Sequence, residues 1–301
     1  MTRTRPLTTD ATRLSAISRL FSPGVFRELA KYGQSGLFAR LAHRAGLPQA
    51  PQAEVTVGDA FDAAFALLRQ SGIRNEYVYR AALTHNVLLG THSLKTASLL
   101  TEFRVGSCKA DLAILNGTGT VYEIKSDRDS LARLDNQIAN YRRVFAKIYV
   151  IAGDSHVEEI MERTPSDIGV MALVRWDRIQ TVREAADRPD LVCPVTICQS
   201  LRTAEAHALL RNLQIAVPAV PNTQMHAALK DCFARLDPAQ VHQEMVRTLK
   251  KSRNLAPLSD LVDRLPVSLQ PAALSIQIRR ADHAQLLNAI ETPLHIAMSW
   301  A

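Results

Sequence analysis

The chain has 301 residues, 47% of them hydrophobic, and carries a formal net charge of +7 at pH 7. This length allows one large or two modest domains. A mean hydropathy of −0.05 indicates a globular chain with a buried core, which excludes an intrinsically disordered one. The absence of any run of about 18 apolar residues argues against a membrane-spanning helix. The basic balance favours a polyanionic partner.

The positive charge is concentrated near the N-terminus. Residues 1–53 contain eight basic and two acidic side chains: Arg3, Arg5, Arg13, Arg19, Arg27, Lys31, Arg40 and Arg44 against Asp10 and Glu28. We expect residues 1–52 to form a basic helical extension that ends in the proline-containing linker Pro48 to Gln52. Three interpretations stay open: a surface that faces nucleic acid, one that docks a partner, and ordinary solvated helices.

The spacing of apolar residues predicts alternating helices and strands over residues 53–180. In chain order we expect a helix over 57–70, a helix that opens at Glu76, strands over 98–105, 109–115 and 120–126, a helix over 130–146, a strand over 147–152, a short helix over 156–163 and a strand over 169–174. This order, αβββαβ with an appended αβ, predicts an α/β domain with a mixed sheet flanked by helices. Residues 181–301 are expected to be mainly helical, with helices over 201–213, 223–236, 238–252 and 281–290.

The second and third expected strands are joined by the turn dipeptide Asn116-Gly117. A hairpin centred on Gly117 places Asp111 directly opposite Glu123, and Lys109 opposite Lys125. Because side chains alternate along a strand, Glu123 and Lys125 share a face. Two carboxylates and an ammonium at one spot suit a divalent cation bound through oxygen. The alternative is an ordinary solvated strand face.

The helix that follows has a second polar feature. Its apolar residues recur at helical spacing (Leu131, Leu134, Ile138 and Phe145), with Asp129 or Ser130 as the expected N-cap. On a neighbouring stripe Arg133, Gln137 and Tyr141 fall at successive i, i+4 positions, so their side chains stack along one line. Taken alone, such a stripe is typical of a solvated helix face.

Together these residues resemble a known family. The pattern D-(x)11-E-x-K followed by Q-x-x-x-Y resembles the PD-(D/E)XK nuclease superfamily, in its RecB-like branch. The approach Gly106, Ser107 and Asp111 is similar to archaeal Holliday-junction resolvases, and the string E-I-K-S-D-x-D-x-L-x-R-L-x-x-Q-I-x-x-Y-x-x-V-F resembles a bacterial and phage-borne subgroup. The resemblance covers about residues 74–175 and implies a restriction-endonuclease-like core.

The resemblance also implies roles for individual residues. Asp111 and Glu123 would hold Mg²⁺ or Mn²⁺, with the Ile124 carbonyl as a further ligand. Lys125 would position or activate the attacking water, and Gln137 and Tyr141 would steady the site or the nucleic-acid backbone. The family expects one more acidic residue upstream, for which Glu76 and Glu102 compete. The basic residues expected to contact nucleic acid are Arg104, Lys109, Arg133 and Arg142.

The function expected from this resemblance is Mg²⁺-dependent hydrolysis of phosphodiester bonds, in DNA rather than RNA, serving phage defence or DNA repair. The alternative is a catalytically silent nuclease fold that acts as a nucleic-acid-binding or protein-interaction module. A homodimer or a partner protein would use the helical regions. Four cysteines without C-x-x-C spacing, and an N-terminus without an apolar signal region, predict a cytoplasmic protein with reduced thiols.

Overall fold

The computed structural model describes residues 11–47, 55–70 and 73–300. The chain divides into two compact units: unit 1 comprises Met1–Ala81 and Leu258–Ala301, and unit 2 comprises Ala82–Pro257. This division differs from the three consecutive domains expected from the sequence (1–52, 53–180 and 181–301). The N-terminal and C-terminal helices belong to one unit because they bury their apolar faces together. The expected linker Pro48 to Gln52 lies outside the described residues, as do Arg3, Arg5 and Asp10.

Unit 1 is helical. Its described helices are α1 (Ala11–Leu20), α2 (Pro23–Tyr32), α3 (Gly36–Arg44), α4 (Val57–Leu68), the start of α5 (Glu76–Leu83), α12 (Ser259–Arg264), η4 (Val267–Leu269), α13 (Gln270–Ser275), η5 (Arg280–Asp282), α14 (His283–Glu291), α15 (Leu294–Ala297) and η6 (Met298–Trp300). Helix α14 packs against α2 and α4, and the rings of Phe21, Phe38 and Phe61 meet in the core. The apolar faces of α1 to α3 are therefore interior, and the basic segment is an integral part of unit 1.

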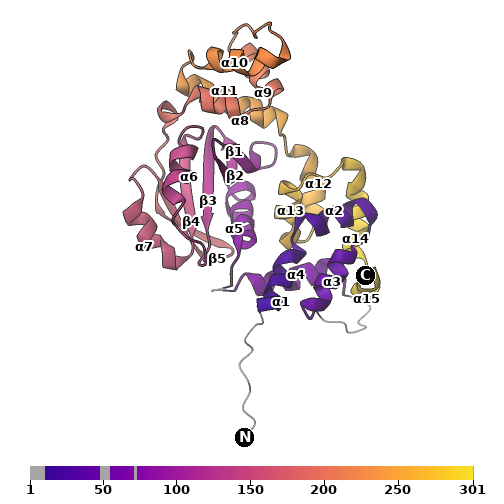
Figure 1. Cartoon of the computed structure of the whole chain (residues 1–301). Coiled ribbons are helices and arrows are strands. Elements are labelled where there is room, and N and C mark those ends of the chain that lie inside the picture. The colour runs from indigo at the N-terminus through magenta and orange to yellow at the C-terminus, as the bar shows by residue number, and fades with distance from the viewer. Residues whose placement is uncertain (1–10, 48–54, 71–72, 301) are drawn as a thin grey trace. The chain divides into compact units, whose positions relative to one another are not determined.

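Unit 2 is built on a six-stranded mixed sheet, in the order β1-β2-β3-β4-β5-β6. Figure 1 labels the strands β1 to β5 of this sheet. The strands are β1 (Ser98–Val105), β2 (Cys108–Asn116), β3 (Thr118–Lys125), β4 (Lys147–Ala152), β5 (Gly169–Arg175) and β6 (Arg178–Arg183). β3, β4 and β5 are parallel, whereas β1, β2 and β6 join antiparallel. The expected α/β class is confirmed: a mixed sheet flanked by helices, with helical N-terminal and C-terminal regions.

Unit 2 also contains helices, several of which pack against the sheet. They are the end of α5, the π-helix η1 (Thr84–Leu89), α6 (Leu134–Tyr141), α7 (Asp154–Arg163), η2 (Pro189–Leu191), α8 (Pro194–Ser200), α9 (Thr203–Asn212), α10 (Asn222–Phe233) and α11 (Pro238–Ser252), with η3 (Ala256–Leu258) at the boundary of the units. Helix α6 contacts β2, α8 contacts β1, and α11 contacts β2 and β3. The apolar residues between them form one core that includes Phe145, Val150 and Phe233.

The hairpin register that places the site is confirmed. Asn116 pairs with Thr118 and Leu112 with Tyr122, so the turn is centred on Gly117, whose φ is +73°. Only glycine adopts such a φ at no steric cost, which is why the Asn-Gly signal was decisive here.

Two elements of the structure differ from those expected from the sequence. The helix expected over 130–146 spans only Leu134–Tyr141, because the Asp129 carboxylate accepts hydrogen bonds from the backbone N–H and the hydroxyl of Ser126 and so closes a turn instead of capping the helix. The edge strand β6 was missed. Its side chains are mostly exposed, so its sequence lacks the apolar alternation that marks a half-buried strand.

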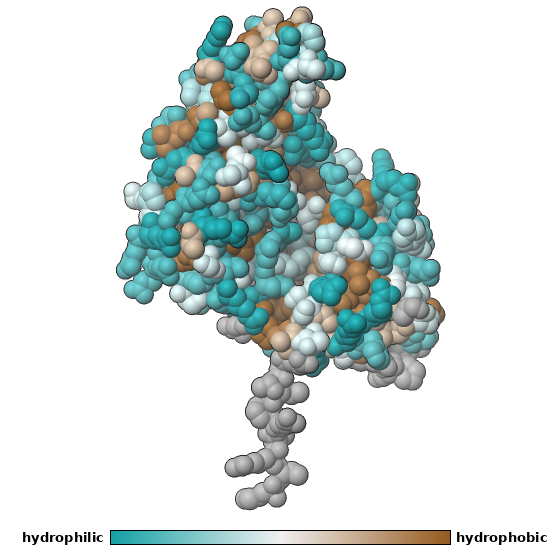
Figure 2. Space-filling model, in the orientation of Figure 1, coloured by the Kyte–Doolittle hydropathy of each residue, from teal (hydrophilic) through white to brown (hydrophobic). Residues whose placement is uncertain are grey.

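None of the described helices is long and apolar enough to cross a membrane. On the face of the molecule drawn in Figure 2, hydrophobic residues form small groups among hydrophilic ones.

Candidate functional site

Asp111 lies where the β2–β3 ladder ends. The last pair of the ladder is Leu112 with Tyr122, so Asp111 and Glu123 occupy the next positions. At this point the backbone N–H of Ile124 donates to Oδ2 of Asp111 at 2.8 Å. The side-chain carboxylate therefore takes the place of a backbone acceptor. The β2–β3 pairing recorded in the structure does not extend to Lys109 and Lys125, which were expected to face one another.

Glu123 is buried, with 1% of its surface exposed, and three polar side chains surround its carboxylate. Lys125 donates to Oε1 at 2.8 Å, the Gln137 amide also donates to Oε1, and the Tyr141 hydroxyl lies 2.7 Å from Oε2. Lys125, itself buried, donates a second hydrogen bond to Oε1 of Gln137 at 2.9 Å. The four residues form one hydrogen-bonded cluster, called the Glu123 cluster below. Sequence spacing alone had assigned Gln137 and Tyr141 to one face of α6, and the structure brings both to Glu123.

Tyr141 connects this cluster to β2. Its hydroxyl lies 2.7 Å from the carbonyl oxygen of Lys109 as well as from Glu123, and its side chain is fully buried. Burial, and to a smaller extent the nearby carboxylate of Glu123, raise the pKa of the Tyr141 phenol well above its usual range, because both disfavour the phenolate. Tyr141 therefore stays protonated and serves as a donor.

Glu102 is the residue of β1 that falls opposite Asp111. Thr101 pairs with Leu112 and Phe103 with Ala110, whereas Glu102, between them, has a φ of +52°. For a residue with a Cβ this left-handed conformation costs about 1–2 kcal/mol. Side chains on a regular strand alternate between its two faces, yet Leu100 and Phe103, three residues apart on β1, belong to the same core. The alternation is therefore interrupted at Glu102. Strained backbone of this kind often occurs at functional sites.

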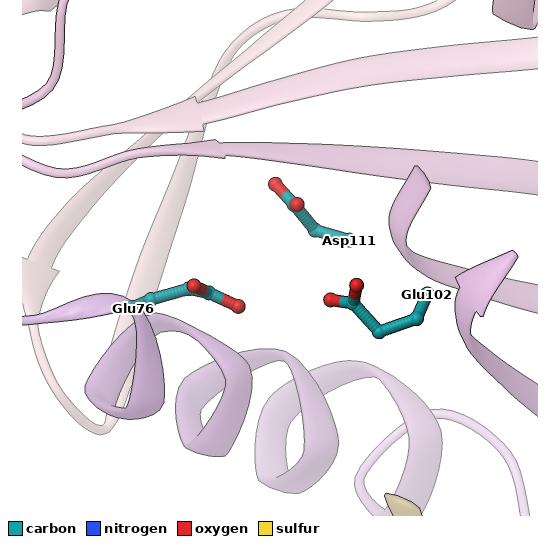
Figure 3. Close-up of side chains that lie close together, drawn as sticks. All are labelled: Glu76, Glu102 and Asp111. Carbon is teal, nitrogen blue, oxygen red and sulfur yellow. The ribbon is translucent and has the colours of Figure 1, made fainter. Parts of the chain in front are cut away.

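The carboxylates of Glu102 and Asp111, both in unit 2, lie close together, as Figure 3 shows. One oxygen of each lies within 4.8 Å of the other. Glu76 is the first residue of α5, the helix in which the chain passes from unit 1 to unit 2, and its carboxylate is paired with Arg80. Within unit 2 the structure thus places Glu102, one of the two competing upstream acids, near Asp111. The expected role of Glu76 stays a prediction. The ammonium of Lys125 lies 2.8 Å from Oε1 of Glu123, and the expected sharing of one cation by Asp111 and Glu123 stays a prediction.

A pocket of about 480 Å³ lies between the end of the β1–β2 hairpin and α6. Polar residues form its wall: Arg104, Gly106, Ser107, Cys108, Lys109, Asp111, Arg133, Asn136 and Gln137. The hairpin turn lies directly on α6, because a Cβ on Gly106 would come within 2.4 Å of Oδ1 of Asn140. Three of the expected basic residues, Arg104, Lys109 and Arg133, therefore share this pocket with Asp111.

Some expectations are not met by the geometry, and some residues were missed. Arg142 makes two hydrogen bonds of 2.8 Å to Asp167 and is not part of the pocket wall, and its expected contact with nucleic acid stays a prediction. The backbone contact recorded at Ile124 is donation by its N–H to Asp111; the expected role of its carbonyl stays a prediction. Asn136 was missed, although its position directly before Gln137 puts it on the adjoining side of α6.

The site residues lie in a segment with known relatives. Residues 69–260, more than half of the chain, match the family described as Bacteriophage P4 protein cII. The chain belongs to this protein cII family. Protein cII of Enterobacteria phage P4 is 29% identical over 203 residues, which cover 64% of this chain and 74% of the phage protein. The matched range contains every residue of the Glu123 cluster and of the pocket, so the candidate site lies within the part that defines the protein cII family.

A solved structure of a protein of unknown function from Silicibacter pomeroyi also matches. It is 19% identical, with a TM-score of 0.31, and the match covers 48% of this chain and 92% of that one. A similarity this low supports no inference about fold or function.

Proposed function

We propose that unit 2 is a metal-dependent nuclease that hydrolyses phosphodiester bonds of DNA, with the site organisation of the PD-(D/E)XK superfamily. The observation that carries the proposal is the Glu123 cluster. Glu123 and Lys125 on β3 and Gln137 and Tyr141 on α6 meet beside Asp111, and all five belong to the motif on which the resemblance rests. Four residues from two elements meeting in one hydrogen-bonded cluster are unlike the solvated strand and helix faces that were the alternatives.

The acidic residues beside the cluster fit a hard divalent cation. Asp111 and Glu102, both in unit 2, offer carboxylate oxygens within 4.8 Å of one another, and oxygen ligands are those that Mg²⁺ and Mn²⁺ prefer. Glu76, the first residue of α5, remains the alternative to Glu102 as the upstream ligand. A bound Mg²⁺ would supply charge stabilisation to the phosphoryl oxygens.

Lys125 is placed to act on water or phosphate. An ammonium has three N–H donors, and two of them bond to Glu123 and Gln137. We expect the third to hold the hydrolytic water or a phosphate oxygen. Because Glu123 and Gln137 fix the ammonium, its position requires no rearrangement during the reaction.

The pocket beside Asp111 fits a phosphodiester backbone. Arg104, Lys109 and Arg133 supply positive charge, and the remaining wall offers amide and hydroxyl groups. No described residue of the wall is aromatic, so a platform for stacking bases is lacking there. The basic residues of the wall would contact phosphates, which carry no sequence information, and recognition through them would be independent of sequence.

One experiment tests the proposal and separates it from the alternative. Labelled linear, circular, single-stranded and branched DNA, with matching RNA, is incubated with the full-length protein in Mg²⁺, Mn²⁺ or EDTA. Asp111→Asn and Lys125→Met are the inactive controls. We expect cleavage of DNA that needs the metal and both residues. Binding without cleavage in any metal would favour the silent binding module, for which the fully hydrogen-bonded carboxylate of Glu123 is the supporting observation.

The remaining expectations belong to this proposal. The four cysteines are free thiols, which agrees with action in the reducing cytoplasm. A role in phage defence or DNA repair, and a homodimer or partner protein bound through the helical regions, stay predictions.

A further inference from the structure

Unit 1 contains a pocket between α1 and α3 that is separate from the candidate nuclease site. Its volume is about 400 Å³, and its polar lining consists of Thr12, Ser15 and Arg19 from α1 and Arg44 from α3, over a base of Ala16 and Leu41. Thr12, Ser15 and Arg19 lie on one side of α1 because they are three and four residues apart. Two guanidinium groups and two hydroxyls therefore border one small hollow.

Within residues 11–47, the described part of the N-terminal segment, basic side chains outnumber acidic ones. Arg19 and Arg44 are exposed, and neither forms an ion pair within the part of the chain that the structure describes. Between Ala11 and Arg44 the sequence contains one acidic residue, Glu28. Its carboxylate already accepts hydrogen bonds from the Ser35 hydroxyl at 2.6 Å and from the backbone N–H of Leu37. Arg40, one turn before Arg44, adds further positive charge to α3.

The apolar side chains of these helices are turned inward. Ile17, Leu20, Phe26, Phe38 and Leu41 are at most 2% exposed. A helix that lies on a lipid surface keeps its large apolar residues outside. A positively charged surface without an exposed apolar face therefore suits a soluble polyanion better than a lipid surface.

We propose that the α1–α3 pocket binds phosphate groups of a nucleic-acid backbone, through Arg19 and Arg44 as cations and Ser15 as a neutral donor. Guanidinium groups suit phosphate because their planar donors match two of its oxygens. The pocket is a second contact outside the Glu123 cluster and the pocket beside Asp111, and it does not depend on cleavage in unit 2.

The test measures binding by the full-length protein to a fluorescein-labelled 20-nucleotide DNA, single-stranded and duplex, in EDTA over a range of salt concentrations. Arg19→Gln/Arg44→Gln is compared with Arg27→Gln/Lys31→Gln. The second pair also removes two exposed charges from unit 1, on α2, outside the pocket. Arg104→Gln/Arg133→Gln reports the contribution of unit 2. Thermal melting verifies that each variant is folded.

The expected result is specific to the pocket. Losing two phosphate contacts should flatten the slope of log binding constant against log salt by about 1.4 for single strands and about 1.8 for duplex, while the α2 pair leaves the slope unchanged. Equal effects of both pairs would mean diffuse attraction and overturn the pocket. No effect of Arg19→Gln/Arg44→Gln on DNA, with loss of binding to vesicles that contain an anionic phospholipid, would assign the site to a membrane instead. Pocket-dependent binding without cleavage would remove the nuclease proposal and leave this one standing.

Discussion

Glu102 lies opposite Asp111 in the β1–β2 register, and it is Glu102 whose backbone adopts a φ of +52°. The strain and the close approach of two carboxylates occur at the same place. The Lys109 ammonium lies 3.8 Å from the Glu102 carboxylate and offsets part of the repulsion. The proposed cation would offset the rest.

Replacing Glu102 separates strain from charge. Glu102→Gly and Glu102→Ala both remove the carboxylate, but only glycine tolerates the positive φ. We expect Glu102→Gly to have a free energy of unfolding about 1 kcal/mol higher than Glu102→Ala, measured by urea denaturation. Both should lose metal-dependent activity. Equal stabilities of the two variants would mean that the strained conformation does not exist in solution.

The buried pair of Glu123 and Lys125 predicts an unusual mutational pattern. Glu123→Ala leaves the Lys125 ammonium buried without its carboxylate, which should lower the free energy of unfolding by about 3–5 kcal/mol. Glu123→Gln/Lys125→Met removes both charges and should cost clearly less than Glu123→Ala. Chemical denaturation of the three proteins provides the comparison. If the double variant is the least stable, the pair is not the reason for the loss.

Tyr141 offers a finer test of the cluster. Tyr141→Phe removes the hydroxyl that joins Glu123 to the Lys109 carbonyl but keeps the buried ring, so we expect a loss of about 1–2 kcal/mol and a moderately slower reaction. Tyr141→Ala also leaves a cavity and should lose about 3–5 kcal/mol. Similar rates for wild type and Tyr141→Phe would make the ring, and not the hydroxyl, the functional part.

A divalent cation should stabilise the folded protein through Asp111. Ligands that bind only the folded state raise its stability by mass action. We expect Mg²⁺ or Mn²⁺ to raise the melting temperature of the wild type and of Asp135→Asn, an exposed acid paired with Arg163, but not of Asp111→Asn. EDTA should reverse the increase. An unchanged response in Asp111→Asn would place the cation elsewhere.

Part of this site followed from sequence because its determinants are local. The Asn116-Gly117 turn fixed the hairpin register, and the i, i+4 spacing put Gln137 and Tyr141 on one side of a helix. No local sequence signal predicts the positive φ of Glu102, since an acidic residue on a strand is ordinarily interpreted as a solvent-exposed side chain. The association of α2 with α14 also could not be predicted, because no short-range pattern specifies which distant apolar faces meet.

The same limit applies to the Glu123 carboxylate. Its position opposite Asp111 suggested a shared cation, but Lys125 two residues later lies on the same face and competes for it. Sequence spacing predicts that Asp111 and Lys125 are both neighbours of Glu123, but it does not decide which of them the Glu123 carboxylate contacts. The partner of Arg142, Asp167, is likewise supplied by a segment beyond α7.

The last prediction concerns His242, which joins α11 to the hairpin. Its Nε2 accepts a hydrogen bond from the backbone N–H of Gly119, so the imidazole must be neutral, and burial lowers its pKa from 6.5 to about 4 despite the opposing effect of Asp187. Since the folded pKa lies below the unfolded one, the unfolded chain binds more protons. The stabilisation is therefore complete above pH 6.5 and is lost as the pH falls toward 4.

The loss over this range should be on the order of 3 kcal/mol. Other groups titrate in the same window, so the measurement compares the pH dependence of the unfolding free energy in wild type, His242→Gln and His295→Gln. In His242→Gln the amide oxygen can still accept from Gly119 but does not titrate, and the decline between pH 6.5 and 4 should be shallower. His295 is exposed, and its replacement should leave the profile unchanged. A wild-type profile in His242→Gln would mean that the imidazole is not neutral and buried at this position.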